Sequence, residues 1–227
     1  MKKIVIITIM ATASLLFAGD MNAALMKQGK DIFQQTCIGC HGADGTGVEQ
    51  GGFNVQPRNL SKTILSEEQI YHVAKKGAFY WGAVVTGMPA WEQVYDDASL
   101  RAVAHYIHHT FGKKSSEYVA SYQYDSSSLS QKILKRGKKI YGRTCAYCHG
   151  KQGHGQGVAT YNPEQSIFPY DLTKVILSEK QIFLFAKHGG EHWGSQADDM
   201  PAWGVKYDDE TLMGIAKYIE TKLKVKR

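Results

Sequence analysis

The sequence lacks several features that would each have decided its class at once. Its 227 residues include no dense tract of Lys and Arg interleaved with aromatic residues, so the net charge of +6 does not indicate nucleic-acid binding. No run alternates strictly between apolar and polar residues, so no β-sheet is predicted. With 43% hydrophobic and 21% charged residues, the chain also lacks the bias of collagen, coiled coils or low-complexity segments. These absences leave an ordinary globular protein.

Long apolar runs are equally scarce, and the one that stands out lies near the amino terminus. Residues 4–18 form an apolar run of 15 residues that follows two lysines and precedes small and polar residues. A helix that crosses a bilayer needs about 20 apolar residues, so a transmembrane anchor is the weaker interpretation. We predict a secretory signal peptide over 1–23, cleaved after Ala23, and hence a periplasmic protein with at most peripheral membrane association.

Cysteine is rare, with four residues in the chain, and all four lie in two copies of the motif Cys-x-x-Cys-His. This spacing is the attachment site of c-type haem, in which two thiols bind the vinyl groups and the next histidine presents its imidazole to the iron. We therefore predict two covalently attached haem c groups. Their attachment residues are Cys37, Cys40, Cys145 and Cys148, and the proximal iron ligands are His41 and His149.

Three other interpretations of the cysteines stay open at this stage. A four-cysteine zinc site needs no histidine after each pair and gives no reason for the two pairs to lie 108 residues apart. A thioredoxin-like redox pair needs one motif in a βαβ setting, which the sequence does not contain. Disulfides, local or crossed, are compatible with a secreted chain.

An internal repeat surrounds the two motifs. Residues 29–33 recur at 137–141, the same offset of 108 residues that separates the motifs, and beyond the motifs the offset becomes 112. Two copies of one haem domain explain this pattern, with domains over 24–112 and 131–227 and a polar linker over 113–130. The segments that recur after the motifs are 66–70 with 178–182, 88–91 with 200–203, and 95–97 with 207–209.

These motifs resemble the class I cytochromes c, in a tandem dihaem form like the periplasmic c4-type carriers. The Met-Pro-Ala-Trp element at 88–91 and 200–203, followed by an acidic turn, also resembles the haem domains of cbb3-type oxidase subunits. The resemblance implies an all-α fold of two tandem domains, each a small helical bundle around one covalent haem, in which a last helix packs across the first.

In this family a methionine is the sixth iron ligand. Met88 and Met200 precede Pro-Ala-Trp at equivalent places of the two repeats, 47 and 51 residues after their histidines, so we expect them to fill that position. The rival histidines have no histidine at their repeat equivalents; they are His72 in the first copy and His154 and His192 in the second.

The resemblance extends to residues around the ligands. Pro57 and Pro169 resemble the family's proline whose carbonyl accepts a hydrogen bond from the proximal imidazole. Trp81 and Trp193 are expected either to donate to a haem propionate or to pack on the haem ring.

Helical spacing supports this fold independently. Residues 25–36 and 131–144 have the spacing of helices, and Gly29 and Gly137 give each a small face for close crossing of another helix. Ser66 and Ser178 are expected helix N-caps. The faces expected to pack inward are Leu100, Val103, Ala104 and Ile107, and in the second copy Leu212, Ile215, Ala216 and Ile219.

The function expected from two thioether-ligated haems is electron transfer rather than catalysis. A free periplasmic carrier between redox proteins is the first interpretation, with unnamed donor and acceptor and no nucleic-acid partner. An electron-transfer subunit of a dehydrogenase or oxidase complex is the alternative, and a dihaem redox enzyme is the least favoured class. The linker residues Tyr118, Val119, Tyr122 and Tyr124 are expected to pack against both domains, so that the haems form an internal relay.

The motifs generate a direct test of cofactor number. Denatured holoprotein should retain two covalent haems, because thioether bonds survive unfolding. Cys148→Ala should weaken attachment in the second domain only, since the first motif is unchanged. Absorbance of the reduced pyridine haem complex per mole of protein measures both values. Zinc in place of iron, in protein matured by a host with a haem-attachment system, would overturn the assignment.

Overall fold

The computed structural model describes residues 21–47, 57–84, 87–161, 169–195 and 200–225. Over these ranges the secondary structure is helical and contains no β-strand, which confirms the predicted all-α fold. None of the helices described is long and apolar enough to cross a membrane. The apolar run at 4–18 lies outside the described residues.

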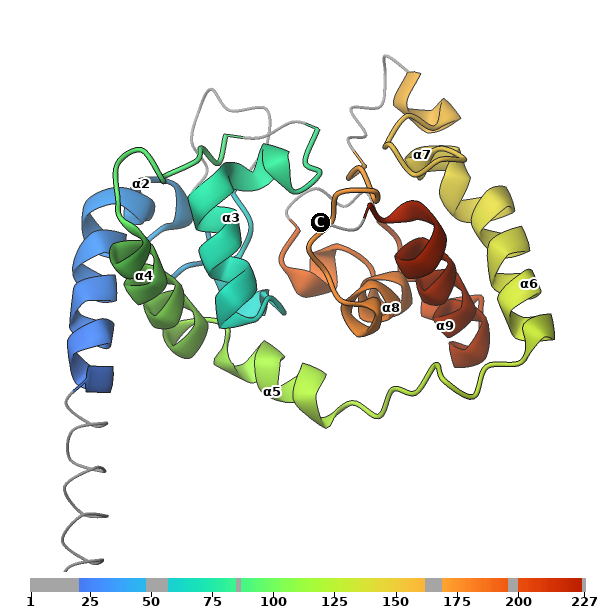
Figure 1. Cartoon of the computed structure of the whole chain (residues 1–227), viewed down its shortest axis with the longest axis horizontal. Helices are drawn as coiled ribbons and strands as arrows, with labels where there is room; N and C mark the ends of the chain where they lie inside the picture. Colours follow the sequence, from blue (N-terminus) through green and yellow to red (C-terminus); the bar gives the residue numbers. More distant parts are fainter. Residues whose placement is uncertain (1–20, 48–56, 85–86, 162–168, 196–199, 226–227) are drawn as a thin grey trace, which may run out of the picture.

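The helices form two similar sets joined by one helix (Figure 1). In the first half, helix 21–32 continues into η1 (Phe33–Cys37) and α2 (Ile38–His41), followed by η2 (Leu60–Lys62), α3 (Glu67–Tyr80) and α4 (Asp97–Thr110). In the second half come α6 (Gln131–Ile140), η3 (Tyr141–Cys145), α7 (Ala146–His149), η4 (Val158–Tyr161), α8 (Glu179–His188), η5 (Glu191–Trp193), η6 (Trp203–Val205), α9 (Asp209–Tyr218) and η7 (Ile219–Leu223). The helix between them is α5 (Lys113–Ser121).

The predicted helices over 25–36 and 131–144 are confirmed, with a change of winding that spacing alone did not indicate. Each α-helix widens into a π-helical turn, η1 or η3, just before the Cys-x-x-Cys-His motif. Ser66 and Ser178 are N-caps as predicted, and each forms a capping box with the glutamine three residues later.

Each half has its own hydrophobic cluster. The first cluster gathers helix 21–32, α3 and α4. The second gathers α8, α9 and the segment around Tyr141, and it also takes in Ile64 from the first half. The faces predicted to point inward are buried, the first in α4 and the second in α9 and the first residue of η7. Figure 1 places helix 21–32 and α6 at the two outer edges, with α3 and α8 toward the middle.

The closest helix crossings occur at two equivalent glycines, as predicted. A Cβ atom on Gly29 would collide with the carbonyl oxygen of Ala102 in α4, and one on Gly137 would collide with the backbone of Gly214 in α9. The absence of a side chain therefore lets the first helix of each half lie directly on the last, which is the packing that the family resemblance implied.

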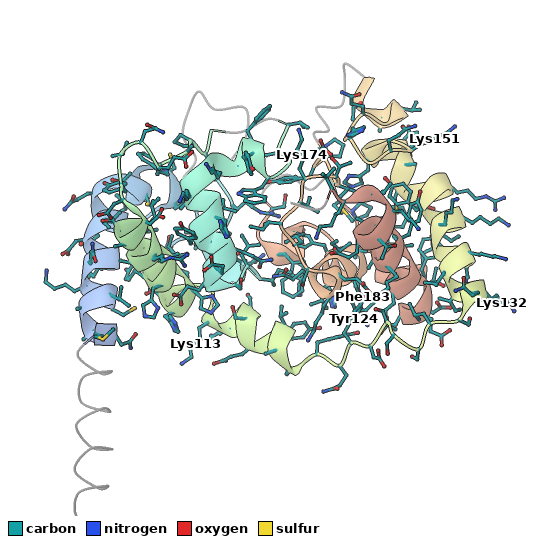
Figure 2. The ribbon with its side chains drawn as sticks, viewed as in Figure 1. Lys113, Tyr124, Lys132, Lys151, Lys174 and Phe183 are labelled. Atoms are coloured by element: carbon teal, nitrogen blue, oxygen red, sulfur yellow. The ribbon has the colours of Figure 1, made fainter. Side chains whose placement is uncertain are left out.

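The segment predicted as a linker contains α5 and is packed rather than extended. Tyr118 packs at a tilt against Trp193, and Tyr122 and Tyr124 pack on Phe183, with ring centroids 5.7, 5.6 and 5.2 Å apart. Figure 2 shows Tyr124 beside Phe183 of α8. The tyrosines thus pack on the second half. Contact with the first half comes from the start of α5, where the Ser115 hydroxyl donates to the Ser61 carbonyl over 3.4 Å.

The two halves also contact each other directly, through backbone groups that are equivalent in the repeat. The N–H of Asn59 donates to the Gly194 carbonyl over 2.9 Å, and the N–H of Asp171 donates to the Gly82 carbonyl over 2.8 Å. Asn59 and Asp171 are repeat equivalents, as are Gly82 and Gly194. The interface is therefore reciprocal, as in a dimer with two-fold symmetry.

A pair of glutamines extends this reciprocity. The side-chain amides of Gln69 and Gln181, each the third residue of its helix, exchange two hydrogen bonds of 2.8 Å. Gln69 Nε2 also donates to the Ile176 carbonyl over 2.9 Å, and Gln181 Nε2 donates to the Ile64 carbonyl over 2.6 Å. Because the two Oε1 atoms also accept the capping-box hydrogen bonds, both amide groups are saturated.

The close helix crossing at Gly137 predicts that adding a side chain there lowers the stability of the second half. Gly137→Ala should lower the free energy of unfolding by about 2 kcal/mol or more, because its Cβ atom would overlap the Gly214 backbone and α6 must move away. Gly142→Ala is the matched control, since a Cβ atom there meets nothing within 4 Å. Chemical denaturation of the holoprotein measures both variants. Equal stability of the two would contradict the close crossing.

Candidate haem-binding sites

Each half presents a histidine at the end of a short helix, directly after its two cysteines. His41 ends α2 and His149 ends α7, so the winding of one helical turn brings thiols and imidazole to the same region. His149 is buried, with 9% of its surface exposed. Burial lowers the pKa of both histidines below the usual value, and each ring is therefore neutral at neutral pH, as an iron ligand requires.

The orientation of each imidazole is fixed by one backbone hydrogen bond. His41 Nδ1 lies 3.3 Å from the carbonyl oxygen of Arg58, and His149 Nδ1 lies 3.0 Å from that of Tyr170. An N–H donated at Nδ1 leaves Nε2 as the lone-pair nitrogen, which is the atom needed for metal ligation.

This geometry corrects the expectation for Pro57 and Pro169. The acceptor in each half is the carbonyl of the residue after the proline, not that of the proline itself. In non-helical backbone, neighbouring carbonyls point in different directions, so only one of the two can face the ring. Each proline directly precedes the acceptor residue, so the hydrogen bond is formed at equivalent positions in the two halves.

The cysteines have the properties of attachment residues rather than those of a disulfide or a reactive pair. None of the four forms a disulfide. Burial raises the pKa of Cys37 to about 11 and that of Cys145 to about 12, opposite to the lowered pKa of a thioredoxin-like nucleophile. Within the described ranges, the one group of three clustered metal-binding side chains contains no cysteine, so the four thiols do not form one zinc site.

The two methionines follow α3 and α8 and are held by equivalent backbone contacts. The N–H of Ala78 donates to the Met88 carbonyl over 3.3 Å, and the N–H of Gly190 donates to the Met200 carbonyl over 2.8 Å. Both methionine side chains are half-buried. The repeat thus places Met88 and Met200 alike, as their spacing predicted.

Two glycines that the sequence analysis did not single out make this placement possible. Gly77 and Gly189 have positive φ values of 74° and 84°, and a Cβ atom on Gly189 would lie 2.8 Å from the Met200 carbonyl oxygen. A residue with a side chain would strain this turn and push the methionine segment away. Their identity at equivalent repeat positions was the signal that could have revealed them.

The rival histidines differ in where the structure places them. His72 pairs with Glu68 over 3.2 Å, and His154 lies 3.6 Å from Asp171. His192 stacks on His188, with ring centroids 4.8 Å apart, and lines a cavity of about 350 Å³ together with Met200. In the second half, a histidine pair therefore lies near the methionine.

The structure differs from one of the two roles expected for Trp81 and Trp193, that of a hydrogen-bond donor to a haem propionate. Trp81 Nε1 donates to the His72 carbonyl and Trp193 Nε1 donates to the Leu184 carbonyl, both over 3.0 Å. Each indole N–H is thus bonded to the helix that precedes it, which corrects the expectation of a propionate donor. Packing by the ring is the role that this geometry leaves, and Trp193 is buried.

The donor set in each half fits haem c. Two thiols outside any disulfide, a neutral imidazole with Nε2 available and a thioether on a fixed loop are the groups that this cofactor uses for attachment and axial ligation.

Comparisons with known proteins agree with this donor set. The family model described as "Cytochrome C oxidase, cbb3-type, subunit III" matches residues 24–107 and 133–219, and confirms the resemblance drawn from the Met-Pro-Ala-Trp element. The two matched regions correspond to the two sets of helices.

Curated relatives are cytochrome c subunits. The cytochrome bc1 complex cytochrome c subunit of Mycobacterium bovis is 24% identical over 155 residues, covering 67% of this chain and 53% of the relative. The cbb3-type cytochrome c oxidase subunit CcoP of Azospirillum brasilense is 26% identical over 208 residues, covering 88% and 63%. The chain thus spans about half to two thirds of these relatives' length.

A solved structure is also similar in part. One chain of the Kuenenia stuttgartiensis reducing HAO-like protein complex matches with a TM-score of 0.48 and 22% identity, covering 87% of this chain and 96% of that one.

The turn at Gly189 generates a test of the methionine position. Gly189→Ala should weaken the near-infrared band of a thioether bound to ferric iron, because a Cβ atom there displaces the Met200 segment. Gly77→Ala should do the same at the other site. Near-infrared absorption of the oxidised holoprotein measures the band. Full band intensity in both variants would contradict the role of these turns.

Proposed function

Because the chain belongs to the cbb3-type cytochrome c oxidase subunit III family, we propose that it is a dihaem c-type cytochrome that transfers electrons for a respiratory complex. Haem c, when bound, supplies a reversible couple between ferric and ferrous iron. The residues that would hold the first haem are Cys37, Cys40, His41 and Met88, and those for the second are Cys145, Cys148, His149 and Met200.

The observation that carries this proposal is the identical proximal arrangement in both halves. In each, the imidazole follows the two thiols on one turn and its Nδ1 is bonded to a backbone carbonyl. This bond holds the ring in one tautomer and makes Nε2 a better donor. Met88 and Met200 would each supply a thioether to the haem, and a thioether ligand favours the reduced state and raises the potential, which suits the oxidising end of a respiratory chain.

The interface between the halves supports an internal relay. Arg58 and Tyr170, whose carbonyls orient the two imidazoles, immediately precede Asn59 and Asp171, whose N–H groups bond to the opposite half. The Arg58 guanidinium also lies 6.0 Å from the Tyr170 ring centroid. Both histidines are therefore anchored to one interface, and electrons would pass between the two haems across it.

The relatives favour a subunit of a complex over a free carrier. Those relatives are named as subunits of the cytochrome bc1 complex and of cbb3-type oxidase, so we propose a periplasmic electron-transfer subunit, with other redox proteins as donor and acceptor. The proposed domains are 24–112 and 131–227, which contain the two matched regions, after removal of a signal peptide over 1–23. Mass spectrometry of the secreted protein tests the cleavage after Ala23.

A redox titration tests the function. The holoprotein should give two one-electron steps. Met88→His and Met200→His should each lower the reduction potential of one haem and remove about half of the near-infrared thioether band. Visible and near-infrared spectra recorded during the titration measure both. An unchanged band in either variant would show that its methionine is not a ligand.

Reactivity separates electron transfer from catalysis. Two irons that each carry a methionine have no open coordination position, so the reduced protein should bind carbon monoxide slowly and should not turn over hydrogen peroxide. Stopped-flow absorption with each ligand provides the measurement. Rapid binding would assign the chain to the enzyme class instead.

A further inference from the structure

A histidine cluster lies outside both haem-binding sites, where α3 meets α4. Glu67 is the first residue of α3, and His105 and His109 lie one turn apart on α4. His105 Nδ1 is 3.0 Å from Glu67 Oε2, and His109 Nε2 is 3.4 Å from the same oxygen. All three atoms lie within 4.8 Å of one another.

These distances suit a single metal ion. Two ligands that each lie about 2.0–2.1 Å from a tetrahedral zinc ion are about 3.3 Å apart, close to both distances from the Glu67 oxygen. Two imidazoles and one carboxylate are ligands that zinc, copper and nickel accept. The His105 side chain is 12% exposed, whereas those of His109 and Glu67 are 47% and 43% exposed, so the group is open to solvent on one side.

The second half shows what the fold needs at this position. There the equivalents of Glu67, His105 and His109 are Glu179, Lys217 and Thr221. Lys217 and Glu179 form an ion pair of 3.1 Å, and the Thr221 hydroxyl donates to the backbone carbonyl of Lys217. The Tyr124 hydroxyl donates to the other oxygen of Glu179 over 2.7 Å, so one cation and one hydroxyl satisfy this glutamate, and a second nitrogen ligand is not required for packing.

We propose that Glu67, His105 and His109 form a binding site for one divalent transition-metal ion, with zinc as the closest fit. The site would tie the first turn of α3 to α4, two helices that share the first hydrophobic cluster. Asn22 Oδ1 lies 2.6 Å from the other nitrogen of His105, Nε2, so cleavage after Ala23 would remove this neighbour without removing a ligand.

Zinc binding to the holoprotein tests the site, because zinc does not exchange electrons with haem. Isothermal titration calorimetry in a buffer that does not chelate metals should give one zinc per chain. Glu67→Gln and His109→Ala should each raise the dissociation constant about 10-fold or more. Both side chains are partly exposed, so both variants should fold, and an unchanged haem spectrum verifies this.

Two control variants locate the binding. Glu179→Gln removes the equivalent carboxylate of the second half, and His192→Ala disrupts the stacked pair of His188 and His192. Neither should change zinc affinity by as much as twofold. The proposal would be overturned by any of three results. These are no zinc binding to the parent protein, an affinity of Glu67→Gln or His109→Ala equal to that of the parent protein, or loss of binding in His192→Ala.

Discussion

The hydrogen bond from each proximal imidazole to a backbone carbonyl is the interaction on which the rest of the arrangement depends. It fixes the tautomer and the direction of Nε2. The acceptor carbonyl belongs to the residue directly before Asn59 in one half and directly before Asp171 in the other. Those two residues are in turn bonded to the opposite half. The direction in which each histidine would bind the proposed haem iron therefore depends on both halves together.

Reciprocity follows from the repeat. A contact between equivalent surfaces of two similar units forms twice, so each favourable pair contributes two hydrogen bonds. The exchange between Gln69 and Gln181 illustrates this, because each amide serves its own capping box and the opposite helix at once. Such a saturated polar contact favours one register between the halves, since a shift would leave the buried Gln181 amide and the half-buried Gln69 amide unpaired.

The two halves differ where the repeat has diverged. The tyrosines of the linker pack on Phe183 and Trp193 of the second half, and a histidine pair lies near Met200. The first half instead carries the cluster of Glu67, His105 and His109. The two proposed haem sites thus lie in different surroundings, and differences of this kind in burial and charge would give the two centres different properties.

The sequence by itself determined what depends on local spacing. Four features depend only on residues within a few turns of one another: the Cys-x-x-Cys-His motifs, the capping serines, the inward faces of α4 and α9, and the glycines at the crossings. Each of these features occurs twice in the repeat, which made it easier to recognise. Tertiary structure decided which carbonyl, Arg58 or Pro57, faces the imidazole, where the Trp81 indole donates, and that His105 and His109 meet Glu67. These contacts depend on the relative positions of separate helices. A shift of about an ångström or two changes the partner of a hydrogen bond, and sequence spacing does not specify positions to that precision.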